Sequence, residues 1–87
     1  MKLCLVTWTD AIGALSRWDF FTEMGKQDPT VIFSVGWLIR DDDVCVEIMP
    51  HINFDVDNSP QGCGNMIIPR SAVKKVVELP KKHWMGT

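Results

Sequence analysis

Tyrosine is absent from this chain of 87 residues, cysteine occurs only three times, and no apolar run approaches the length of a membrane span. A membrane-spanning helix needs about 20 consecutive apolar residues, so we expect no membrane partner. Cys4, Cys45 and Cys63 are odd in number and widely spaced, which matches neither a disulfide framework nor a zinc site. Cys4 and Cys45 also lie within apolar runs, where a reduced cysteine behaves as a small apolar residue. We therefore expect free thiols and a cytoplasmic location.

An excess of charge of one sign is also lacking, because 9 basic residues face 11 acidic ones and the net charge is −2. Such a balance gives little attraction for phosphate backbones, so nucleic acid is not the favoured partner. His51 and His83 have no companion at metal-ligand spacing, and no hydrolase, nucleotide-loop or zinc-protease motif occurs. We expect no catalytic residue, no metal and no cofactor. A Cys63–His51 pair is conceivable, but a chance pairing is the stronger interpretation.

What the chain does contain is β-forming sequence, with 46% hydrophobic residues and short β-branched runs. The central run, Thr30–Arg40, carries apolar side chains on both faces, so it predicts either a central strand or a strand with one face against another subunit. Gly36 within it favours a bend in a strongly curved sheet. The full set of predicted strands is Lys2–Trp8, Thr30–Arg40, Val44–Pro50, Met66–Ile68 and Val73–Leu79.

The connections differ in kind. Asp41, Asp42 and Asp43 predict a hairpin turn, because a calcium loop needs ligands at alternate positions, a glycine and a distal glutamate. Ser16 with Asp19 resembles a capping pair and predicts a short helix over Ser16–Met24. The polar segment His51–Gly64 predicts a loop, in which "INFDV" can form a short edge piece, and Arg70–Ala72 a tight turn.

These elements predict one domain over residues 1–79, followed by a tail at residues 80–87. The fold class is mainly β: a five-stranded antiparallel sheet that closes into a small barrel, with one short helix between the first two strands.

Three motifs in order, "VTWTDA", "SVGWLIRDDD" and "IPRSAVKKVVEL", resemble a family of small phage and prophage proteins. The resemblance covers most of Leu5–Leu79 and implies a phage-encoded protein in the host cytosol. A weaker, architectural resemblance links "VGWLIRDDDVCVEIMP" and "GNMIIPRSAVKKVV" to SH3-like and Sm-like small barrels. It implies that Arg70 and Ser71 stand where the bacterial Sm-like chaperone contacts RNA. This chain departs from that family because it begins with a strand, lacks a clear first Sm motif and is acidic.

Binding is better supported than catalysis, because several indoles stand beside polar groups. An aromatic platform, an arginine for phosphate and a carboxylate for a hydroxyl or amine can together hold a nucleotide. For each of these residues, core packing or an ordinary surface role is the competing interpretation. The candidate ligand-binding residues are Trp8, Asp10, Trp18, Trp37, His51, Arg70 and Ser71.

Two hypotheses follow from these candidates. In the first, a small homo-oligomeric protein binds a nucleotide-type ligand at subunit boundaries and acts as an anti-defence sponge for a host immune signal. In the second, a protein-interaction module inhibits a host protein through its aromatic and acidic loops. Sm-like RNA binding is a third and weaker alternative.

Overall fold

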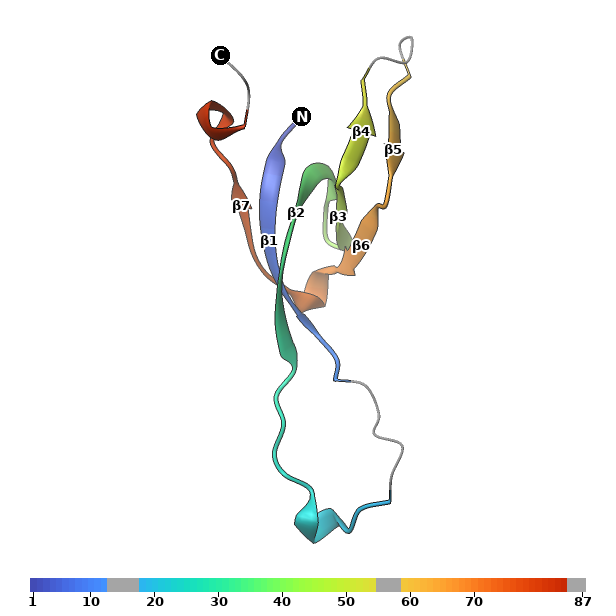
Figure 1. The fold of residues 1–87 in the computed structure, drawn as a ribbon, viewed down its shortest axis with the longest axis vertical. Helices are drawn as coiled ribbons and strands as arrows, with labels where there is room; N and C mark the ends of the chain where they lie inside the picture. Colours follow the sequence, from blue (N-terminus) through green and yellow to red (C-terminus); the bar gives the residue numbers. More distant parts are fainter. Residues whose placement is uncertain (13–17, 55–58, 85–87) are drawn as a thin grey trace.

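The computed structural model describes residues 1–12, 18–54 and 59–84, and this part of the chain is built from β-strands and single 3-10 turns (Figure 1). The strands are β1 (Leu3–Asp10), β2 (Thr30–Asp41), β3 (Cys45–Met49), β4 (His51–Asn53), β5 (Gln61–Cys63), β6 (Met66–Pro69) and β7 (Val73–Glu78). The 3-10 turns are η1 (Phe21–Glu23), η2 (Arg70–Ala72) and η3 (Lys81–His83).

Five of the strands form one antiparallel sheet in the order β6-β3-β2-β1-β7. The mainly β fold and the five expected strands are confirmed, with end points that shift by one or two residues. The largest shift is in β1, which continues past Trp8 to Asp10. η2 follows β6 directly and leads into β7, so it joins the two edge strands of the sheet.

One face of this sheet carries the core. The buried apolar side chains of the described residues come from β1, β3 and β6: Cys4, Val6, Cys45, Val46, Ile48 and Ile68. Trp8, Leu38, Ala72, Val73 and Val76 pack around them. This core is small for a chain of 87 residues, and it leaves the opposite face of β1 and β2 outside.

Gly36 explains how β2 serves two neighbours. The first part of β2 pairs with β1, and from Trp37 onward the strand also pairs with β3. A Cβ atom at Gly36 would lie 3.0 Å from Ile48 Cβ and 3.1 Å from the Met49 nitrogen, so the close approach of β3 requires a glycine there. The predicted bend in a curved sheet thus coincides with a contact between backbones.

Asp42 and Asp43 lie in the turn of the β2–β3 hairpin, as expected, and Asp41 is the last residue of β2, paired with Val46. Asp42 Oδ1 accepts hydrogen bonds from the backbone N–H groups of Val44 (2.8 Å) and Cys45 (3.0 Å). The Asp42 N–H donates to the Cys45 carbonyl at 3.1 Å. One side chain therefore satisfies the turn, which is the local role that aspartate plays in such loops.

Two expectations fare differently. The segment His51–Gly64 is not simply a loop, because β4 and β5 pair within it as a two-stranded ribbon. Of "INFDV", only Ile52 and Asn53 belong to β4, and Asp55 and Val56 lie outside the described residues. The helix expected over Ser16–Met24 is not confirmed: residues 13–17 lie outside the described residues, and η1 is the only helical turn in residues 18–24. The Asn65–Glu47 hydrogen bond (2.9 Å) anchors the return from β5 to the sheet.

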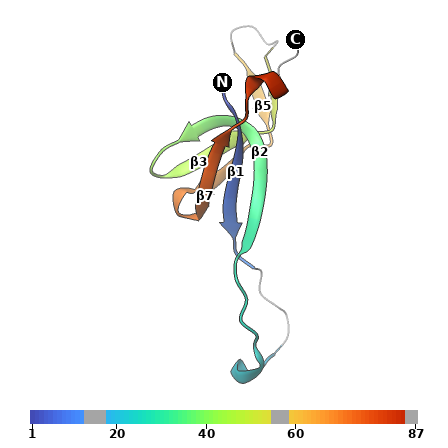
Figure 2. The same cartoon turned by 90° about the vertical axis from the view of Figure 1, so that its left-hand side faces the viewer.

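The molecule is elongated, with principal extents of 58, 25 and 24 Å. Its radius of gyration is 17.6 Å, whereas a compact chain of this length has about 12 Å. Figures 1 and 2 show the cause: in the connection between β1 and β2 (residues 11–29), the described residues 18–29 extend far from the sheet on the side opposite the N-terminus. We call this connection the arm. Within the described residues, no helix has the length and apolar character needed to cross a membrane.

Candidate functional site

The side of the β7–β1–β2 sheet that faces away from the core is apolar. Leu5 pairs with Val35 on one side and with Val77 on the other, and Thr7 pairs in the same way with Phe33 and Lys75. Directly paired residues of antiparallel strands point to the same side, so these rows form one surface. We call it the outer face. Its central residues on β2 are exposed: Val31, Phe33 and Val35.

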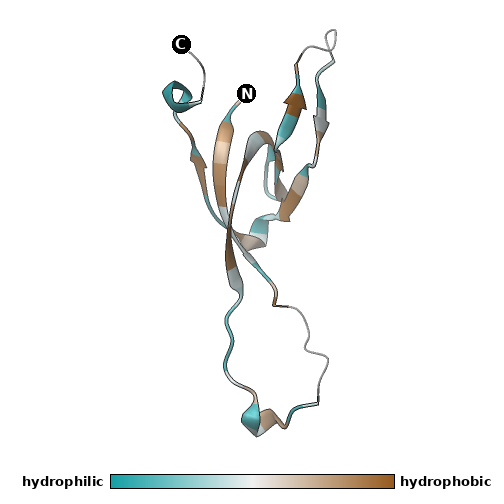
Figure 3. Ribbon diagram, in the orientation of Figure 1, coloured by the Kyte–Doolittle hydropathy of each residue, from teal (hydrophilic) through white to brown (hydrophobic). Residues whose placement is uncertain are grey.

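Phe33 is the largest side chain in the middle of this face, and 68% of it is exposed. The lower part of β2, which includes Val31 and Phe33, is coloured as strongly hydrophobic in Figure 3. Because most of this phenylalanine stays in contact with water, its burial adds little to the stability of a single copy. An exposed apolar patch of several neighbouring residues is typical of an interaction surface.

The outer face ends at a group of three aromatic residues. Trp37 meets Phe54 edge to face, with ring centroids 6.2 Å apart, and meets Trp84 in the same way at 6.4 Å. Trp84 Nε1 donates to the Leu79 carbonyl at 3.2 Å. This bond and the edge-on contacts place Trp84 of the expected tail against the sheet. These contacts are of the kind that aromatic pairs prefer.

The arm carries a second set of exposed apolar residues. Its described part, residues 11–12 and 18–29, includes Trp18, Phe20, Phe21 and Met24. Trp18 is fully exposed, and 89% of Phe21 is exposed on η1. Three aromatic rings within four residues, all open to water, have no role in the core.

Among the predicted ligand-binding residues, Trp8 and Asp10 have structural partners. Trp8 packs against the core, and its Nε1 donates to Ser34 Oγ at 3.0 Å. Asp10 ends β1, and its Oδ1 accepts the N–H of Ala11 at 2.9 Å. The indole of Trp8 therefore supports the sheet from the core side and is not an open stacking platform.

Arg70 is paired with Asp41. The Arg70 Nη1 donates to Asp41 Oδ1 in a salt bridge between side chains that are each more than one third exposed. The Arg70 N–H also donates to the Val44 carbonyl at 3.0 Å. Residues at and beside the β2–β3 turn therefore also hold η2 in place. Ser71, the next residue of η2, is exposed.

A second ion pair joins Arg40 to the same turn, with 2.5 Å between Arg40 Nε and Asp42 Oδ2. The bond from Arg40, followed by those from the N–H groups of Cys45 and Val44, lowers the pKa of Asp42 from 3.8 to about 2. The same bond to Asp42 raises the pKa of Arg40. Both arginines of this region are therefore already bound to carboxylates of the turn.

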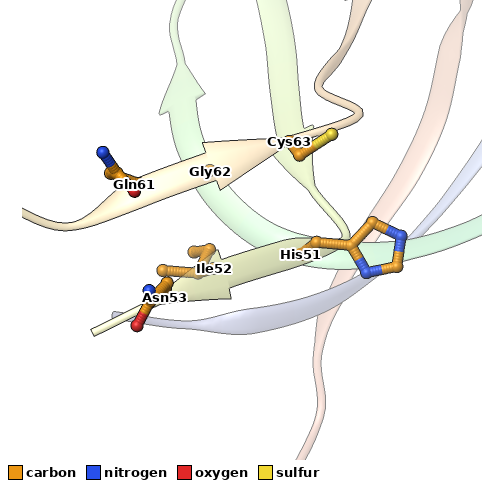
Figure 4. A pocket seen from close by; sticks show the side chains of 6 residues that line it. All are labelled: His51, Ile52, Asn53, Gln61, Gly62 and Cys63. Atoms are coloured by element: carbon orange, nitrogen blue, oxygen red, sulfur yellow. The ribbon is translucent and has the colours of Figure 1, made fainter. Parts of the chain in front are cut away.

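The β4–β5 ribbon contains a shallow hollow of about 350 Å³, shown in Figure 4. Its lining residues are His51, Ile52, Asn53, Gln61, Gly62 and Cys63. His51 and Cys63 are direct partners across the ribbon. The Cys63–His51 pair considered from the sequence is therefore close in space. None of the lining residues is a lysine, arginine, aspartate or glutamate, and in the described parts of the chain no three metal-binding side chains come together.

The structure therefore distributes the seven predicted residues over several places instead of gathering them. Only Arg70 and Ser71 share one element; the others lie at the core (Trp8), the end of β1 (Asp10), the arm (Trp18), the aromatic group (Trp37) and the ribbon (His51). The residues that do gather were not singled out in the sequence: Val31, Phe33, Val35, Phe54 and Trp84. The signal for the first three was present in the two apolar faces of Thr30–Arg40.

An antiparallel sheet with one small core, an apolar outer face and an exposed aromatic arm defines the class of this molecule as a small, mainly β protein with two exposed apolar surfaces. No family model, no curated protein and no solved structure matches the chain. Its function must therefore be argued from the surfaces themselves.

Proposed function

We propose that this chain is a non-catalytic binding protein that works as a homo-oligomer, with the outer face buried between copies. The observation that carries the proposal is the exposed area. The chain exposes 7086 Å², whereas a folded monomer of 9.9 kDa exposes about 5,200 Å². The excess, roughly 1,900 Å², exceeds the ~800 Å² that each partner buries in a standard interface.

The shape of the sheet supports a finer statement about its architecture. β2 is shared between β1 and β3 around Gly36, and η2 contacts both β1 and β3 while joining the edge strands. We propose that this curvature makes the sheet a small SH3-like barrel. A small barrel has little interior for a ligand, so ligand pockets of a useful size would form between copies.

The test of oligomerisation is light scattering coupled to size exclusion. We expect the wild-type chain to elute at a multiple of 9.9 kDa. Phe33→Asp places a charge in the centre of the outer face and should return the protein to the monomer mass. The matched control is Val44→Asp, because Val44 on the β2–β3 turn is 67% exposed, almost the same as Phe33. A wild-type protein that stays at the monomer mass at every concentration would refute the proposal.

The narrower part of the proposal concerns the ligand. A phage-encoded oligomer of this kind would sequester a nucleotide-type immune signal of the host at subunit boundaries. Its aromatic residues would stack on the base, and Arg70, exchanging its bond to Asp41, would bind phosphate.

Thermal shift with cyclic dinucleotides and ADP-ribose-type compounds tests this part. Ligand at 100 times its Kd should stabilise the protein by about 2.7 kcal/mol. Arg70→Ala should reduce the ligand-induced shift, measured against its own ligand-free melting temperature. The absence of any shift in melting temperature would refute nucleotide binding, and it would not affect the proposed homo-oligomer.

The second candidate class is a module that inhibits a host protein. The exposed aromatic residues of the arm favour it, because such residues are enriched at the centres of protein interfaces. A pull-down from host lysate should then return one stoichiometric partner, and the yield should fall with Phe21→Asp. A purified chain that captures nothing, yet self-associates, would favour the homo-oligomer.

A further inference from the structure

The arm is much longer than the connection that the sheet requires. Asp10 and Thr30 are direct partners in the β1–β2 pair, and a two-residue hairpin loop is enough to join such partners. In this chain the connection consists of residues 11–29. Loops of this length within a small domain are uncommon and are usually functional.

The apolar residues of the arm lie beyond the reach of their own core. Trp18, Phe20 and Phe21 are each at least three-quarters exposed, and Met24 is half exposed. The core is formed by β1, β3 and β6 at the other end of the molecule (Figures 1 and 2). Within one copy, therefore, the apolar surface at the tip of the arm is left uncovered.

The direction in which the arm leaves the sheet is fixed near Asp28-Pro29. Proline holds its own φ near −65°, and it keeps the preceding residue in an extended conformation. Asp28 and Pro29 stand directly before Thr30, so the chain enters β2 nearly straight. Figure 2 shows the arm continuing along the long axis of the sheet. The described part of the arm therefore extends beyond the end of the sheet and does not fold back over the outer face of its own copy.

Charge at the two surfaces is complementary. Lys75 pairs with Thr7, which places its side chain on the outer face in the same row as Phe33, with Thr7 between them. The arm carries Glu23 on η1, two residues after Phe21. An aromatic tip with an adjacent carboxylate suits an apolar face with an adjacent ammonium group.

We propose that the arm of one copy packs on the outer face of a second copy, with Phe21 against Phe33. Two-fold symmetry makes the contact reciprocal, so each copy gives an arm and receives one. This inference rests on the proposed homo-oligomer and specifies which surfaces form its interface. The exposed area in excess of a compact monomer is large enough for two such contacts per copy.

The experiment is cross-linking between two differently labelled copies. Both copies carry Cys63→Ser, which removes the exposed native thiol and leaves the buried Cys4 and Cys45. One copy then receives Thr22→Cys on η1, and the other receives Thr7→Cys beside Phe33 on the outer face. The two chains differ in tag length, are produced together and are treated with a short bismaleimide.

We expect most of the cross-linked product to join a Thr22→Cys chain to a Thr7→Cys chain. The matched control replaces Thr7→Cys with Ser71→Cys, an exposed position on η2 away from the outer face, and should give little mixed product. Phe21→Asp in the first copy should abolish the Thr22–Thr7 product.

Each other outcome has a definite meaning. If the wild-type chain is monomeric, the proposed homo-oligomer and this inference both fail. If it is oligomeric but the Thr7→Cys and Ser71→Cys pairs react equally, the oligomer stands and the exchange of arms is wrong. If one chain carrying both Thr22→Cys and Thr7→Cys cross-links within itself at low concentration, the arm covers its own copy and the inference is overturned.

Discussion

At the residue scale, Asp42 is the side chain on which the β2–β3 turn depends. Its carboxylate accepts two backbone hydrogen bonds and one from Arg40, whereas Asp43 makes no side-chain hydrogen bond within the described residues. Asp42→Ala should therefore lower the melting temperature by several degrees, and Asp43→Ala should leave it nearly unchanged. Thermal unfolding followed by circular dichroism measures both. Equal effects of the two substitutions would contradict this account of the turn.

The same carboxylate predicts a pH dependence with a definite sign. The pKa of Asp42 is lowered from 3.8 to about 2 by Arg40 and by the N–H groups of Cys45 and Val44. A group whose folded pKa is lowered stabilises the fold above its unfolded pKa, and this contribution is lost as the pH falls through the folded value. The difference in melting temperature between wild type and Asp42→Asn should therefore be constant at pH values above 3.8. It should shrink as the pH falls towards about 2. A difference that grows on acidification would refute the assignment.

The three thiols differ in their surroundings, which predicts a difference in reactivity. Cys4 and Cys45 are buried and Cys63 is exposed. Burial, followed by the charge of Glu78, raises the pKa of the Cys4 thiol and so lowers its thiolate fraction. A thiol reagent should modify one group per native chain, lost in Cys63→Ser, and three after unfolding. Fast modification of more than one thiol in the folded protein would show that the core opens.

At the scale of the element, β2 depends on a glycine at its bend. Gly36→Ala places a Cβ within 3.0–3.2 Å of Ile48 Cβ and of Met49 backbone atoms, which cannot move aside as a flexible side chain can. We expect the substitution to destabilise the protein by about 1–3 kcal/mol. Gly25→Ala is the matched control, because a Cβ at Gly25 would meet nothing within 4 Å. Urea unfolding of both variants measures the difference, and a neutral Gly36→Ala would show that β3 adjusts freely.

The strands could be predicted from the sequence because their signals are local. Alternation and β-branched residues identified β1, β2, β3, β6 and β7, and the aspartates identified the turn. β4 and β5 were missed as a pair, since "HIN" and "QGC" carry little β preference. The ribbon also packs on Met49 of β3, whose side-chain atoms lie 2.7–2.9 Å from where a Cβ of Gly62 would be, and this contact is not visible in the sequence.

The site shows where local signals fail. The helix predicted from Ser16 and Asp19 stays unconfirmed, because residues 13–17 lie outside the described residues and residues 18–24 contain only the 3-10 turn η1. The aromatic group of Trp37, Phe54 and Trp84 joins residues far apart in the sequence. Arg70 looked available for a ligand, and only the fold shows that Asp41 binds it. Long-range pairs of this kind leave no mark in one sequence.

At the scale of the whole molecule, a small core and an elongated shape have one consequence for stability. The described part of the chain buries six apolar side chains, and the radius of gyration of 17.6 Å exceeds that of a compact chain of 87 residues. If copies cover that surface for each other, folding and association are linked, and the melting temperature must rise with protein concentration. A protein that does not associate would have the same melting temperature at every protein concentration.

A chain with a shortened arm separates the contribution of the arm to association from that of the outer face. Replacing residues 11–29 by Asn-Gly between Asp10 and Thr30 keeps the register of β1 and β2, because Asn-Gly suits a two-residue hairpin loop. The sheet and its core residues remain, so we expect a folded chain whose melting temperature no longer depends on concentration. Calorimetry over a wide concentration range, alongside the wild type, makes the comparison. A shortened chain that still melts higher as it is concentrated would show that the outer face associates without the arm.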